Sequence, residues 1–189
     1  MALLMINTVT QTLAEILAEG SPSITTEQID FERPAALEQY FSPRLNLYCY
    51  DIRENTKVNY AGQAKESNAD QDCSFIWFDL SFLITAWDRT TLGEQHLLSE
   101  ALSLLGNYRS LPEELLAPGL QGRGSLPLKV SAQEIKDTAT FWSALGVPLR
   151  PALYVTVTVP LSYQPNPTSK LVSKSPFSQK KLIKLGKHS

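Results

Sequence analysis

Cysteine is scarce in this sequence. Among its 189 residues there are two cysteines, Cys49 and Cys73, each flanked by aromatic or aliphatic residues. A disulfide framework or a zinc site needs clustered or paired cysteines, so the spacing excludes both. We expect two buried free thiols in a reducing compartment.

Long hydrophobic runs are also missing. The segment from Met1 to Ile6 has no basic region, and Asn7 and Thr8 interrupt it before it reaches signal-peptide length. No later run approaches the ~20 apolar residues that a membrane-spanning helix needs. We therefore expect a cytoplasmic protein, and Met5 is a second candidate for the native start.

Patterns that carry catalysis are absent as well. His96 and Ser99 are three residues apart near Asp88, but such neighbours point outward along one face of a helix, and no Gly-x-Ser-x-Gly elbow is present. A solvated helix face is the favoured interpretation. The two histidines, His96 and His188, have no metal-ligand spacing. We predict no catalytic residue and no metal site.

The glycine-rich segment at 119–124 lacks the setting of a nucleotide site. Its glycines neither follow a predicted strand nor open a predicted helix, and no Lys-Ser/Thr pair follows them. Glu113 and Glu114 are adjacent and diverge on any regular element, which argues against an acid–base pair. We predict no cofactor, no small-molecule substrate and no enzymatic activity.

The charge of the chain is divided unevenly. The composition, 43% hydrophobic and 19% charged, is typical of a soluble domain with a packed core. The net charge of −2 combines −8 through Tyr163, from 11 basic and 19 acidic residues, with +6 from six later lysines. Pro160, Pro165 and Pro167 mark the change. We divide the chain into a domain at residues 1–163 and a basic Pro/Ser/Lys-rich tail at residues 164–189.

Apolar residues repeat with helical spacing in three segments. The first begins at a cap on Asn7 or Thr8 and ends at Gly20. The second covers residues 91–106, and the third covers residues 131–146, beginning with a Ser-x-x-Glu capping box. The residues expected to face the core are Val9, Leu13, Ile16 and Leu17, then Leu97, Leu98, Ala101, Leu102, Leu104 and Leu105, then Ile135, Ala139, Trp142 and Leu145.

Alternating apolar and polar residues predict strands at 45–50, 74–87 and 152–160. The strand at 74–87 has large groups on both faces and should be central, whereas the strand at 152–160 should be half exposed. Weaker patterns predict strands at 24–31 and 129–130. Together these elements indicate an α/β (α+β) fold with a mostly antiparallel sheet flanked by helices.

Residues 54–72 form a polar stretch without hydrophobic pattern. Nearly twenty residues are long for a plain connection. We expect either a flexible loop or a hairpin tip that becomes ordered on a partner.

The lysine-rich tail is the remaining functional candidate, and three interpretations stay open. It is a solvated disordered end, a segment that binds nucleic acid or an anionic membrane, or a segment that docks as a strand or short helix on an acidic neighbouring subunit. The third interpretation uses apolar residues set among the lysines. The candidate partner-binding residues are Lys170, Lys174, Phe177, Lys180, Lys181, Leu182, Ile183, Lys184, Leu185 and Lys187.

The order of several segments resembles a known family. The strand at 78–87 followed by the helix from Glu94 resembles a block in the N-terminal domain of cap, or tail-terminator, proteins of contractile injection systems of the virulence-cassette and antifeeding-prophage type. The resemblance spans about residues 6–161, with the segments 46–48, 141–146 and 153–159 in the same order. The Arg-Asn pair common after the Leu-Tyr strand of the family is missing. We expect a minimal cap, without the extra C-terminal domains of larger members.

The resemblance implies a tail-terminator-like fold and a structural role. The implied assembly is a homo-hexamer ring that closes the distal end of the inner tube and contractile sheath and ends their polymerisation. Its partners would be the inner tube protein and the contractile sheath protein, in a cytoplasmic injection particle, and we do not expect nucleic acid or membrane as partners. The alternative is a cytosolic adaptor whose basic tail binds nucleic acid or anionic lipid.

Overall fold

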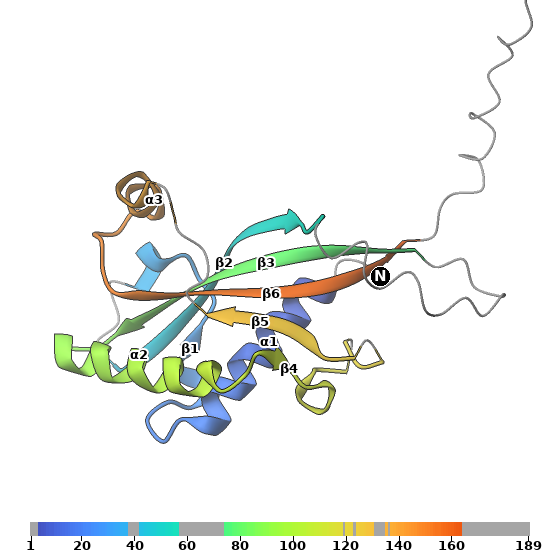
Figure 1. The fold of residues 1–189 in the computed structure, drawn as a ribbon. Helices are drawn as coiled ribbons and strands as arrows, with labels where there is room; N and C mark the ends of the chain where they lie inside the picture. The colour runs from blue at the N-terminus through green and yellow to red at the C-terminus, as the bar shows by residue number, and fades with distance from the viewer. Residues whose placement is uncertain are drawn as a thin grey trace, which may run out of the picture.

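Two long strands form the middle of a six-stranded sheet with the order β1-β2-β3-β6-β5-β4 (Figure 1). The computed structural model describes residues 4–37, 42–56, 74–118, 120–122, 124–130, 135 and 137–163. The strands are β1 (Ile29–Asp30), β2 (Arg44–Glu54), β3 (Ser74–Trp87), β4 (Ser110–Leu111), β5 (Leu126–Val130) and β6 (Ala152–Tyr163).

The central position of β3 is confirmed. It pairs antiparallel with β2 on one side and with β6 on the other, from Ser74 opposite Tyr163 to Thr85 opposite Ala152. Of the described pairings, only that of β1 with β2 is parallel. The predicted mostly antiparallel sheet is therefore confirmed.

Helices α1 (Leu4–Gly20) and α2 (Thr91–Gly106) cover one face of this sheet (Figure 1). The apolar face predicted for α1 is buried throughout. Its predicted start is wrong, because the helix begins at Leu4 and Asn7 and Thr8 lie inside it. Ile6 packs against the core, which favours continuing the helix through this polar pair. The hydroxyl of Thr12 donates to the carbonyl of Thr8 (3.0 Å), a bond made within the helix.

Helix α2 begins where the sequence predicts, since the Thr90 hydroxyl accepts a hydrogen bond from the amide of Gly93 (3.0 Å). Four of the six predicted core positions are buried, and Leu104 packs against them. Leu102 is 46% exposed, so its assignment to the core is wrong. Successive helical residues are rotated by about 100°, which places Leu102 beyond the buried stripe that includes Ala101.

Helix α3 (Thr138–Leu145) packs on the opposite face of the sheet (Figure 1). Trp142 and Leu145 are buried there as predicted, in a small second core with Leu83 and Trp87 of β3. Ile135 precedes the helix and Ala139 is exposed, so neither belongs to its buried face.

The predicted start of α3 is wrong. Ser131 and Glu134 lie outside the described residues, and the helix is capped by Asp137, whose carboxylate accepts from the amide of Thr140 (3.0 Å). This hydrogen bond lowers the pKa of Asp137. A carboxylate at a helix N-terminus also complements the helix dipole, which favours a start here.

Several strand boundaries differ from the predictions. The strand expected at 24–31 is reduced to β1, because the Gln28 side chain accepts from the amide of Thr25 (3.1 Å) and closes a 3-10 turn before it. Phe31, the last residue of the predicted strand, is 51% exposed. Strand β2 extends to Glu54 through an irregularity in its register, and β5 begins at Leu126. Most of the polar stretch at 54–72 lies outside the described residues.

The face of β6 that should be half exposed is more covered than predicted. Tyr154 and Thr156 are half-buried, but Thr158 is 5% exposed and its hydroxyl donates to an Asp79 carboxylate oxygen (2.6 Å). Asp79 lies directly opposite Thr158 in the pairing of β3 with β6, and Phe141 of α3 packs near Tyr154 farther along this face.

The glycine that ends α3 is required by its backbone conformation. Gly146 has φ 79°, and a Cβ there would approach the Ala35 side chain to 3.3 Å. We expect Gly146→Ala to lower the free energy of unfolding by about 1–2 kcal/mol, because the left-handed region disfavours a Cβ. Urea denaturation tests this. Gly106→Ala is the matched control, since a Cβ at that helical position meets no atom within 4 Å and the change should not destabilise the protein.

Candidate partner-binding surface

The structure does not assemble the catalytic triad that His96, Ser99 and Asp88 suggest. The Ser99 hydroxyl donates to the carbonyl of Gln95 (2.7 Å), a bond within the helix. Asp88 accepts from the amide of Arg89 (2.7 Å) beside the start of α2. His96 is paired with Glu100 (2.8 Å), so each of the three groups has a separate structural partner.

Glu100 joins α2 to the turn that follows α1. Its carboxylate accepts hydrogen bonds from the hydroxyls of Ser21 (2.5 Å) and Ser23 (2.8 Å). Partial burial by itself raises the pKa of Glu100, but these hydrogen bonds and the neighbouring His96 outweigh it, so the pKa lies below its ordinary value. The ionised carboxylate is therefore the form that ties the two elements together.

This carboxylate predicts a pH dependence of stability. A depressed pKa in the folded state contributes stability that is present above the ordinary pKa of 4.5 and is lost as pH falls through the folded value. We expect Glu100→Gln to lose most stability relative to wild type near neutral pH and to converge with it in acid. Urea midpoints measured for both proteins from neutral to acid pH test this, and a constant difference would contradict it.

The glycine-rich segment has a structural role. Gly122 and Gly124 have φ of 81° and 71°, and the amide of Gly122 donates to the Glu113 carboxylate. The carboxylate occupies this amide, and its negative charge repels a phosphate. Glu113 and Glu114 are both exposed, and Glu113 has the bond to Gly122.

Within the described residues, no group of three or more His, Cys, Asp or Glu side chains has an arrangement that could hold a metal ion. In the same part of the chain, no helix has the length and apolar character needed to cross a bilayer. Cys49 is a free thiol that is only half-buried, and burial raises its pKa. Cys73 lies outside the described residues.

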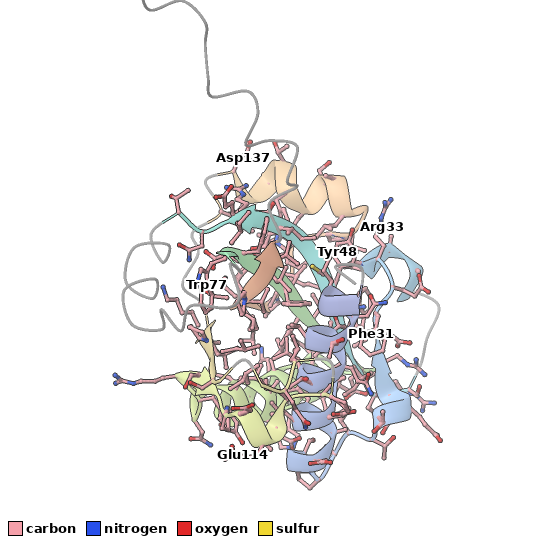
Figure 2. The ribbon with its side chains drawn as sticks, turned by 90° about the vertical axis from the view of Figure 1, so that its right-hand side faces the viewer. Phe31, Arg33, Tyr48, Trp77, Glu114 and Asp137 are labelled. Atoms are coloured by element: carbon pink, nitrogen blue, oxygen red, sulfur yellow. The ribbon has the colours of Figure 1, made fainter. Side chains whose placement is uncertain are left out.

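An apolar groove of about 590 Å³ lies between α1 and β2. Ile6, Thr10 and Ala14 line it from the helix. Leu47, Tyr48 and Cys49 line it from the strand, and Phe31 and Thr26 close another side. Figure 2 shows Phe31 and Tyr48 on the same side of the molecule, beside α1.

The groove follows an edge of the sheet. Strand β1 pairs with β2 only at Ile29 with Leu45 and Asp30 with Asn46. In the described part of the chain, no strand pairs with the outer edge of β2 from Leu47 to Glu54. An edge strand presents a row of backbone N–H and C=O groups that an added chain can pair with. We call the groove together with this edge the β2 edge groove.

Exposed apolar side chains also occur at the end of the sheet where β3 ends and β6 begins. Leu92 at the start of α2 is 78% exposed and Leu149 before β6 is 68% exposed. The guanidinium of Arg150 stacks on the Trp87 ring (3.7 Å to its centroid) and donates to Glu94 (2.6 Å). These contacts hold the segment before β6 against α2.

The partner-binding residues predicted in the tail, from Lys170 to Lys187, lie outside the described residues, so that assignment stays a prediction.

The sequence did not point to the β2 edge groove. One signal was available, because Phe31 is a large apolar residue between two acidic neighbours, Asp30 and Glu32, three positions before Pro34. Its exposure follows only from the early end of β1.

Comparison with known families gives one decisive match. The sequence model of the Pvc16 N-terminal domain matches residues 8–174. The chain belongs to the Pvc16 N-terminal domain family. The resemblance drawn from the segment order is therefore confirmed, and the family match extends from the described domain into the tail. A search of curated protein sequences found no match.

Two solved structures share the fold of this Pvc16 N-terminal domain. One is a sheath/tube terminator of PVC, an extracellular contractile injection system, with TM-score 0.62 and 20% identity over 97% of this chain. The other is the tube-terminating cap of the anti-feeding prophage, with TM-score 0.53 and 19% identity over 96% of this chain. The match spans 64% and 60% of those chains, so each is longer than the part matched here.

Proposed function

We propose that this protein is a structural cap, or tail terminator, of a contractile injection system. In this role it closes the distal end of the inner tube and sheath and ends their polymerisation. The supporting observation is the fold it shares, over nearly its whole length, with a PVC sheath/tube terminator, together with its place in the Pvc16 N-terminal domain family. The proposed location is the cytoplasm, within an assembled particle.

A hexameric ring is the proposed form of the cap. Rings close when head-to-tail contacts return on themselves, whereas contacts that do not close extend into filaments. A subunit that ends a stack therefore needs surfaces for its ring neighbours and for the layer below. The β2 edge groove and the exposed Leu92 and Leu149 supply two such surfaces, one along the β2 edge and one at the end of the sheet where β3 ends.

The proposed role requires no chemistry. The polar groups that suggested catalysis have structural partners: Ser99 and Asp88 bond to backbone, His96 pairs with Glu100, and Glu113 holds a glycine turn. These contacts agree with a protein that acts by binding.

Particle length tests the proposed function. We expect tube and sheath proteins that are co-expressed without the cap to form particles of widely varying length, and addition of this chain to restore a narrow distribution. Negative-stain microscopy gives the lengths. A Leu92→Asp, Leu149→Asp variant tests whether the exposed apolar end contributes. An unchanged length distribution with and without the chain would contradict the proposal.

We propose that the basic tail contributes to partner contacts in the particle. Removal of residues 164–189 should then reduce the fraction of capped particles, and normally capped particles would contradict the proposal. The adaptor alternative rests on the charge of +6 carried by the six tail lysines. Salt-sensitive retention of the intact protein on DNA or anionic vesicles would favour that alternative.

A further inference from the structure

We propose that the tail of one subunit, residues 164–189, adds as a strand to the β2 edge groove of the adjacent subunit in the ring. Its backbone pairs with the outer edge of β2, and its apolar side chains enter the groove beside α1. This inference rests on the proposed ring, but it assigns a specific donor and a specific acceptor to one contact.

The acceptor is the outer edge of β2 beyond Asn46. Eight residues, from Leu47 to Glu54, have no strand on that side within the described chain. This length exceeds the usual strand of about 5–6 residues. Proteins generally cover or shorten such edges, because an exposed edge pairs with other chains. An extended segment that adds to it gains a full set of backbone hydrogen bonds.

The groove supplies the side-chain contacts that an added strand needs. Consecutive strand residues point to opposite faces, so a lining that includes Leu47, Tyr48 and Cys49 places the groove along the strand edge rather than on one face. Phe31 and Ile52, which are 51% and 47% exposed, extend the apolar surface along the edge. An added strand can therefore bury alternate apolar side chains against α1.

Charge favours the tail as the occupant. Four acidic residues lie in the groove, next to its lining or at the end of the open edge. Two further acidic residues, Asp30 and Asp51, are neutralised by ion pairs. Apart from Arg44 and Arg53, which form these ion pairs, Arg33 is the one basic residue of the described chain near the groove. The tail has six lysines and no acid, with apolar residues among the lysines. The four acidic residues are Glu15, Glu27, Glu32 and Glu54.

The spacing within the tail allows a contact with a neighbouring subunit. Tyr163 ends β6 at the same end of the sheet as Glu54, two strands away, because Ser74 pairs with Tyr163 and Phe78 with Glu54. The two strand spacings and the offset of four residues in register together separate Tyr163 from Glu54 by about 16 Å. The densest lysine and apolar cluster, residues 180–187, follows a spacer of 16 residues that can extend about 50 Å. Such a spacer is long enough to reach the groove of an adjacent subunit.

A disulfide cross-link tests the proposal in the full chain. Cys49 lines the groove, so a protein with the changes Cys73→Ser and Ile183→Cys should form a bond on mild oxidation at raised pH. The bond joins the thiol introduced into the tail of one subunit to Cys49 of the next. We expect non-reducing gels to show a ladder of covalent multimers. The ladder should be lost in Cys49→Ser and in the protein without the Ile183→Cys change.

Three further variants separate the effect of charge from the effect of position in the chain. Glu15→Lys reverses a charge in the groove lining and should reduce cross-linking severalfold at low salt. Glu114→Lys changes an exposed acidic residue that lies away from Phe31 and Tyr48 (Figure 2) and should leave cross-linking unchanged. Ser169→Cys, in the spacer, should cross-link far less than Ile183→Cys.

Light scattering of the same samples separates this inference from the proposed function. Assembled protein that forms no bond to Cys49 would overturn the tail contact and leave the ring intact. An intramolecular bond, seen as a faster-migrating monomer, would overturn the contact between subunits. Protein that stays monomeric with tube protein present would contradict both proposals.

Discussion

The substitution Phe82→Ala is expected to cost about 3–5 kcal/mol of the free energy of unfolding, the largest effect of any single change considered. Phe82 is fully buried in the middle of β3, where it faces the core between α1, α2 and the sheet. Removing its ring leaves a cavity at the strand that pairs with both β2 and β6. Small domains have a total stability of about 5–15 kcal/mol, so this loss is severe.

Equilibrium urea denaturation checks the value, with Phe31→Ala as the matched control. Phe31 is 51% exposed, and its truncation should change stability by about 0.5 kcal/mol or less. Equal losses for the two variants would contradict the assignment of the core.

The substitution Asn46→Leu is expected to release β1 from the sheet. Asn46 is fully buried, and its side-chain amide donates to the carbonyls of Glu32 (2.8 Å) and Asp30 (3.3 Å). Leucine cannot donate, so these carbonyls lose a partner at a cost of about 1–3 kcal/mol each where they stay buried. The loss falls on β1, which has only two paired residues to hold it.

Hydrogen exchange measured by mass spectrometry locates this effect. Peptides that cover residues 26–36 should exchange faster in Asn46→Leu, while peptides from β3 and β6 change little. Thr85→Val is the control, because it removes the acceptor of the Trp87 indole (3.1 Å) and a long contact to Asn46 (3.5 Å) but keeps both bonds to the β1 segment. Faster exchange of residues 26–36 in the control as well would contradict the assignment.

Much of the sheet could be predicted from the sequence, because the pattern of a long strand is read over many residues. The strand at 74–87 alternates over fourteen residues with bulk on both faces, and its bounds and central place are confirmed. The helix bounds were less predictable, because competing local signals are similar in strength. Ser131 and Asp137 are both good caps, and the packing of Trp142 and Leu145 on β3 favours the shorter helix.

The β2 edge groove could not be predicted, because the sequence does not show which strands pair or in which register. Ile29 and Phe31 gave an alternating pattern, but in the observed parallel register a strand that ends at Phe31 reaches only Leu47 of the open edge. The Gln28 side chain also bonds to the amide of Thr25 (3.1 Å) and the carbonyl of Pro43 (2.9 Å), and these contacts arise only in the fold. The tail was found from composition alone, which shows that a segment is basic but gives no information on where it binds.

The mass of the purified full-length protein in solution, with and without tube protein, is the most direct test of the cap assignment. Light scattering should give a mass six times the 21.0 kDa of the monomer, either for the protein alone or for the protein that co-purifies with tubes. A closed ring is the property that ends a polymer, so this result is the one that the proposed function requires. A monomer of 21.0 kDa that does not bind tube protein would contradict the cap assignment and favour the adaptor alternative.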